Sequence, residues 1–81
     1  MIIDFYTKEN CLLCEEALTL LETLKTLYTF EINICDIHAN DEWLEKYFLL
    51  IPVIDVNGTI VTGKDIHFTY LEQVIQENLK K

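Results

Sequence analysis

Hydrophobic and polar residues follow one another along the chain in patterns that predict alternating strands and helices. Residues 2–6 are β-branched or aromatic apart from one aspartate and predict a strand that ends at the polar stretch 7–10. From residue 12 to about residue 27, apolar residues recur at intervals of three and four, as in an amphipathic helix with one face on a core. The residues expected on this buried face are Leu13, Ala17, Leu20, Leu21, Leu24 and Leu27.

The middle of the chain predicts a second strand and a short helix. Residues 30–34 alternate between apolar and polar side chains, as a half-buried strand does. Asn40 is a suitable N-cap for a helix over residues 41–48, whose first residues are acidic and therefore favourable at the positive end of the helix dipole.

A turn signal joins the next two strands. The dipeptide Asn57-Gly58 lies between the β-rich runs 53–56 and 59–62. Both residue types accept the positive φ that a type I′ turn requires, so the pattern predicts an antiparallel hairpin.

The last helix is predicted from a capping signal. Thr69 and Glu72 have the spacing of a capping box, and an apolar stripe continues from there to the end of the chain. The order of elements is then βαβαββα, which predicts an α/β fold: a mixed four-stranded sheet with helices on both faces. A chain of 81 residues can close one hydrophobic core, so we expect a single domain over residues 1–81.

The acidic composition narrows the range of partners. A net charge of −8 leaves no basic stripe, which argues against binding to nucleic acid or to an anionic membrane surface. The first residues lack the features of a signal peptide, and the longest apolar run, residues 47–54, is too short to span a bilayer. We therefore expect a cytoplasmic protein.

The cysteines supply the candidate chemistry. Three is an odd number, which fits a structural disulfide framework poorly and suits catalytic or metal-binding thiols better. Cys11 and Cys14 fall at the first turn of the predicted helix after the first strand. Unpaired N–H groups and the helix dipole stabilise a thiolate there, and the spacing brings Cys14 close enough to attack a mixed disulfide on Cys11. The glutamates Glu9, Glu15 and Glu16 oppose this effect, so Cys11 is expected to be less acidic than beside a basic rim.

Several segments together resemble the glutaredoxin family, a branch of the thioredoxin-like fold. They are residues 5–14, Asp36, Ile51-Pro52-Val53 and the turn at Gly58. The closest similarity is to small bacterial glutaredoxin-like proteins with a Cys-x-Leu-Cys active site. The resemblance implies a thiol–disulfide oxidoreductase with Cys11 as nucleophile, Cys14 as resolving thiol and a cis peptide bond before Pro52.

The resemblance also implies substrate contacts. Lys8 matches a family lysine that holds the thiolate and a glutathione carboxylate, and the backbone of Ile51 is expected to be free to bind an extended substrate. Gly63 and Asp65 stand where many glutaredoxins have a Gly-Gly pair and an acidic residue that hold glutathione, although only one glycine is present. The implied partner is glutathione or a protein disulfide. No bound cofactor is required, and a monomer is expected.

Two other interpretations remain open. Cys11, Cys14, Cys35 and His38 have a spacing close to that of a zinc ribbon, which suggests a zinc or iron–sulfur site. Otherwise Cys35 is a small residue near the end of an edge strand and His38 a solvated loop residue.

The remaining alternative is a thioredoxin-fold binding module without turnover, since fold alone never establishes activity. The apolar run 47–50 suggests such a binding surface. The simpler interpretation of this run is that two or three of its side chains seal the core.

Overall fold

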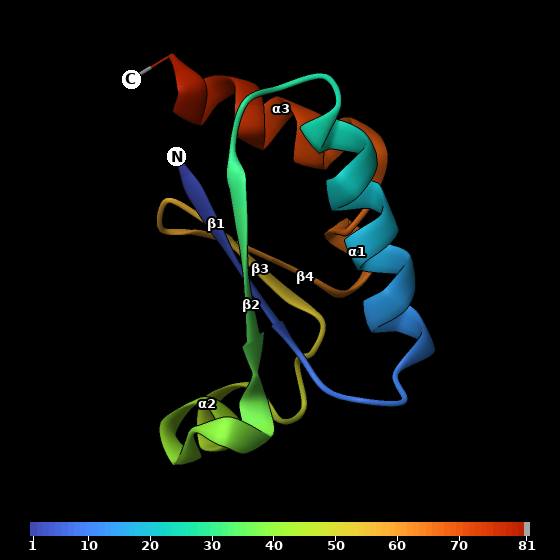
Figure 1. Cartoon of the computed structure of the whole chain (residues 1–81), viewed down its shortest axis with the longest axis vertical. Helices are drawn as coiled ribbons and strands as arrows, with labels where there is room; N and C mark the ends of the chain where they lie inside the picture. The colour runs from blue at the N-terminus through green and yellow to red at the C-terminus, as the bar shows by residue number, and fades with distance from the viewer. Residues whose placement is uncertain (81) are drawn as a thin grey trace.

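A computed structural model describes residues 1–80 and contains a four-stranded mixed sheet with the strand order β2-β1-β3-β4 (Figure 1). β1 pairs in parallel with β2 and antiparallel with β3, which pairs antiparallel with β4. The strands are β1 (Ile2–Thr7), β2 (Glu31–Asp36), β3 (Val53–Val56) and β4 (Thr59–Thr62). The helices are α1 (Leu12–Lys25), α2 (Asp41–Tyr47) and α3 (Phe68–Leu79), with short 3-10 turns η1 (Ile37–Ala39) and η2 (Gly63–Asp65). The predicted α/β fold and element order are confirmed.

Two local signals form as the sequence predicts. Asn57 and Gly58 have φ values of 53° and 98°, and the Gly58 N–H donates to Asp55 Oδ1 at 2.8 Å, which closes the β3–β4 hairpin. Asn40 caps α2, because its Oδ1 accepts from the N–H groups of Glu42 and Trp43 at 2.9 and 3.2 Å.

The sheet separates two hydrophobic clusters. α1 and α3 lie beside each other on one face, whereas α2 lies beyond the carboxyl end of β2 (Figure 1). Successive residues of a strand point to opposite faces, so Phe5 belongs to the α1–α3 side and Tyr6 to the α2 side. The larger cluster on the α1–α3 side contains Ile3, Phe5, Cys14, Ala17, Leu21, Leu24, Phe30, Ile54, Val56, Val61, Leu71, Val74 and Ile75. The smaller cluster contains Tyr6, Cys35, Ile37, Tyr47 and Val53.

The buried face of α1 differs from the predicted one. Cys14, Ala17, Leu21 and Leu24 form it, while Leu13 is 63 % exposed. The helix ends at Lys25, so Leu27 lies beyond it. The apolar pattern is wide enough to fit more than one phase of the helix, and the phase with Cys14 inward is the one that packs on β1.

Two boundaries also differ. β2 covers Glu31–Asp36, because parallel pairing with β1 continues to Thr7 opposite Asp36. The predicted capping box at the start of the last helix is wrong: His67 is the N-cap, and its Nδ1 accepts from the Tyr70 N–H at 3.3 Å. Glu72 instead accepts from the hydroxyl of Tyr28 at 3.0 Å, which ties α3 to the segment after α1.

Within residues 1–80, no helix is both long and apolar enough to cross a membrane.

Candidate active site

Cys11 and Cys14 lie at the junction between β1 and α1. Asn10, with a φ of 54°, turns the chain in the left-handed region that asparagine tolerates. Cys11 follows as the N-cap of α1 with extended backbone angles, and its carbonyl accepts the first helical bond from the Glu15 N–H at 3.0 Å. The Cα atoms of the two cysteines are 5.2 Å apart, and their Sγ atoms lie within disulfide-bonding distance.

The environments of the two sulfur atoms differ. The backbone N–H of Cys14 donates to Cys11 Sγ at 3.2 Å, so Cys11 occupies the place of a capping side chain at the positive end of the helix. Cys11 is half-buried, while Cys14 is only 2 % exposed. A substrate therefore reaches the Cys11 sulfur more easily, and the Cys14 sulfur is shielded behind it.

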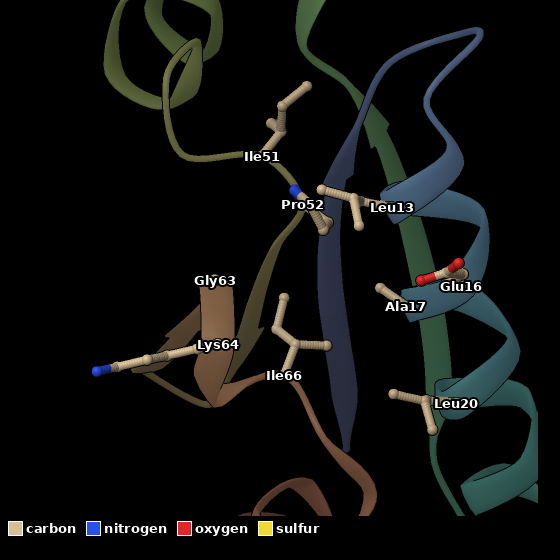
Figure 2. Close-up of a pocket in the computed structure, with 9 residues that line it drawn as sticks. All are labelled: Leu13, Glu16, Ala17, Leu20, Ile51, Pro52, Gly63, Lys64 and Ile66. Carbon is tan, nitrogen blue, oxygen red and sulfur yellow. The ribbon is translucent and has the colours of Figure 1, made fainter.

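A groove of about 430 Å³ lies along α1 and reaches Leu13, the residue before Cys14, although neither cysteine lines it (Figure 2). Residues of α1 form one wall, and the segments before β3 and after β4 form the other. The lining is mostly apolar and consists of Leu13, Glu16, Ala17, Leu20, Ile51, Pro52, Gly63, Lys64 and Ile66. In Figure 2 the Glu16 carboxylate stays at the α1 wall, whereas the amino group of Lys64 extends away from that helix.

The sequence-predicted contact residues divide into two groups. Ile51, Pro52 and Gly63 line the groove, and the Ile51–Pro52 peptide bond is cis. Lys8 and Asp65 are exposed and do not line it. The structure therefore brings the proline segment and the glycine after β4 to one side of α1, but not the two charged residues.

The prediction that the Ile51 backbone is free is only half right. Its N–H donates to the Tyr47 carbonyl at 3.1 Å and is therefore not available to a substrate. The Ile51 carbonyl has no hydrogen-bond donor among residues 1–80. One acceptor, and not a donor and acceptor pair, is open at this position.

The apolar run before Ile51 is largely exposed. Only Tyr47 is buried, whereas Phe48, Leu49 and Leu50 are 56, 89 and 49 % exposed. The expectation that two or three of these side chains seal the core is wrong, because α2 ends at Tyr47 and the following turn carries them outward.

The proposed four-residue metal site does not form. Cys14 belongs to the cluster on the α1–α3 side and Cys35 to the cluster on the α2 side, so the sheet separates them. His38 is exposed in η1. Residues 1–80 contain no group of three or more His, Cys, Asp or Glu side chains placed to hold a metal ion.

Comparison with known proteins agrees with this geometry. A family model described as "Glutaredoxin-like domain (DUF836)" matches residues 2–80. The chain belongs to this glutaredoxin-like family. Its structure is similar to that of thioredoxin 1 from the thermophilic eubacterium Thermosipho africanus TCF52B, with a TM-score of 0.71, 14 % identity and coverage of 99 % of this chain and 96 % of the other. A malarial protein is also similar, with a TM-score of 0.62, 22 % identity and coverage of 96 % of both chains. These similarities show a shared thioredoxin-like fold.

Within this glutaredoxin-like domain, the sequence pattern missed most of the α1 wall. Leu13, Ala17 and Leu20 recur at four- and three-residue spacing and looked like part of a core stripe, and Glu16 lies three positions after Leu13 on the same side of the helix. A glutamate within that stripe was the available signal that part of it faces an open groove.

Proposed function

We propose that this glutaredoxin-like domain is a thiol–disulfide oxidoreductase that reduces disulfides of proteins or of glutathione. The thiolate of Cys11 attacks one sulfur of the substrate disulfide, the substrate S–S bond breaks, and the leaving thiolate takes up a proton. The thiolate of Cys14 then attacks Cys11 Sγ and releases the second substrate thiol. The protein dithiol loses two electrons and becomes a disulfide, and an external thiol, glutathione or a protein reductase, restores it.

The observation that carries this proposal is the position of the cysteine pair at the start of α1. Cys11 Sγ accepts the Cys14 N–H at 3.2 Å, which favours a negatively charged sulfur. Cys14 Sγ is within bonding distance of it but shielded from solvent, as a resolving thiol should be. The different exposure of the two cysteines supports Cys11 as the nucleophile and Cys14 as the resolving thiol.

The groove beside the pair supports the same function. Pro52 lies across from Leu13, the residue that precedes Cys14 (Figure 2). The open carbonyl of Ile51 can accept one hydrogen bond from the backbone of an extended substrate. Such a contact would hold the substrate disulfide beside Cys11 while the sulfur atoms exchange.

The test is to trap the intermediate. A Cys14→Ser variant lacks the resolving thiol, so incubation with a peptide disulfide should leave a stable mixed disulfide on Cys11, detected as added mass on the tryptic peptide. A Cys11→Ser variant is the matched control and should form no adduct at Cys14. A Cys14→Ser protein that forms no adduct would contradict the proposal and favour a binding module without turnover.

A further inference from the structure

The groove beside the cysteine pair has an uneven distribution of charge. Glu16 is the only charged residue on its α1 wall, and Glu15 directly precedes it. Lys64, the only other charged lining residue, directs its amino group away from α1 (Figure 2). A bound molecule that packs along α1 therefore meets a carboxylate and no cation.

Among the described residues that line the groove, Lys64 is the one cation that could meet a carboxylate, and it lies on the wall opposite α1 (Figure 2). The chain contains no arginine, whose planar guanidinium binds carboxylates through two parallel hydrogen bonds. Glutathione carries two carboxylates and one ammonium group, so its negative charges find no matched partner along the α1 wall. Lys8 and Asp65, the other candidates for holding glutathione, do not line the groove.

Apolar surface surrounds the same site. Leu12 and Leu13, between the two cysteines, are 69 and 63 % exposed, and Leu50, directly before Ile51, is 49 % exposed. A volume of about 430 Å³ is within the usual range for ligand pockets, about 300–1,000 Å³. Apolar side chains next to a substrate cysteine would remove this exposed surface from water, which favours their binding.

We propose that the preferred substrate is a disulfide in an extended, apolar polypeptide segment that carries a basic residue opposite Glu16, and that oxidised glutathione is a poor substrate. This inference rests on the proposed oxidoreductase function. Leu13, Ile51 and Pro52 bind the apolar side chains, and the Glu16 carboxylate attracts the basic one. Cys11 attacks every disulfide by the same reaction, and the charge of Glu16 determines which substrates bind best beside it.

The experiment uses peptide disulfides that release a coloured thiol. The peptides share one sequence, with a cysteine flanked by leucines, and differ only at one neighbouring position, which is Lys, Gln or Glu. In each peptide the cysteine is linked to thionitrobenzoate through a disulfide bond. Glutathione linked to thionitrobenzoate is the comparison. Reduced protein loses two electrons and each substrate yields free thionitrobenzoate and a peptide thiol, so the absorbance gives the second-order rate constant directly.

We expect rates in the order Lys, Gln, Glu, with glutathione slowest. An exposed ion pair with the Lys peptide supplies about fivefold at most, and repulsion between Glu16 and the Glu peptide adds a smaller factor. The Lys and Glu peptides should therefore differ by about threefold to tenfold at low salt. Glu16→Lys should reverse their order. Glu22→Lys makes the same charge change at an exposed position of α1 outside the groove and should keep the wild-type order.

The outcomes separate the two proposals. No release above that of Cys11→Ser with any substrate would refute the oxidoreductase function itself. If all substrates release thionitrobenzoate, but Glu16→Lys does not change the order of their rates, the oxidoreductase function stands and the substrate preference is overturned. The substrate preference would also be overturned if the wild-type protein sediments as a dimer and Glu16→Lys as a monomer. A second copy of the chain would then occupy the groove.

Discussion

On one face of the sheet, Cys14 sits in the large cluster under α1 and α3, next to a half-buried Cys11 that accepts a backbone N–H. On the other face, Cys35 sits in the small cluster near α2, and burial, followed by the charge of Asp4, raises the pKa of its thiol. The side chain is the same, but Cys11 is itself the N-cap of a helix and partly accessible to solvent, whereas Cys35 is buried within a strand. Position at a helix N-terminus and exposure to solvent both favour a reactive thiolate, so under the proposed function disulfide exchange belongs to the Cys11 side of the sheet.

The largest effect is expected in the rate of disulfide reduction. Cys11→Ser removes the proposed nucleophile and should lower the rate at least about a thousandfold, as expected for loss of a nucleophile. Cys35→Ala is the matched control on the opposite face and should change the rate less than about twofold. If Cys35→Ala remains folded but lowers the rate as much as Cys11→Ser does, the reaction is not confined to the cysteines on the α1–α3 side of the sheet.

The next effect is on stability and compares the two clusters. Leu21 is fully buried in the large cluster, and Leu21→Ala should lower the free energy of unfolding by about 3 kcal/mol through lost burial and a cavity. Ile37→Ala in the small cluster should cost about 2 kcal/mol, because fewer neighbours surround it and the turn η1 can relax. Urea denaturation measures both.

The control for these variants lies just beyond α1. Leu27 is 59 % exposed, so Leu27→Ala should change the free energy of unfolding by less than about 0.5 kcal/mol. A cost for Leu27→Ala close to that of Leu21→Ala would contradict the observed phase and end of the helix.

A smaller effect concerns alkaline pH at Tyr6 on the α2 side. Burial, together with the neighbouring Tyr47 and the charge of Asp4, raises the pKa of Tyr6 from 10.0 to about 12. The folded state therefore keeps this proton more tightly than the unfolded state. The resulting stabilisation is complete below pH 10 and is lost as pH rises from about 10 through 12.

Tyr6→Phe removes this titration. Between pH 10 and 12, the free energy of unfolding of the wild type should fall by up to about 2 kcal/mol more than that of Tyr6→Phe. Urea denaturation at each pH measures both. Tyr70→Phe, at a partly exposed tyrosine of α3, is the matched control. Equal alkaline losses in the wild type and in Tyr6→Phe would mean that the Tyr6 phenol does not hold its proton as described.

Local signals in the sequence predicted most of the fold. Asn57-Gly58 and Asn40 act through their own backbone and side chains, so the hairpin and the start of α2 could be predicted without knowledge of the rest of the chain. The helix phase, which buried Cys14 and exposed Leu13, depends on contacts with β1 and could not. α3 begins at Phe68 with His67 as its cap, and Glu72 is bonded to Tyr28, a residue 44 positions away that no local pattern indicates.

The site was predictable to the same extent. Cys11 and Cys14 are three positions apart in the sequence and lie at a local junction of strand and helix, so their proximity follows from spacing alone. The groove required three separate segments to converge, and the sequence indicated Ile51, Pro52 and Gly63 only through resemblance to a family. The Ile51 N–H was wrongly predicted as free, because the turn after α2 uses it.

The most direct measurement compares all three thiols in one sample. Fully reduced protein is alkylated briefly at a series of pH values, and mass spectrometry of the peptides gives the rate for each cysteine. Cys11 should react fastest, with a midpoint below the free-thiol value of about 8.5, and Cys35 slowest, with a midpoint above it. A midpoint for Cys11 at or above about 8.5, or faster reaction of Cys35, would contradict the assignment of Cys11 as the nucleophile.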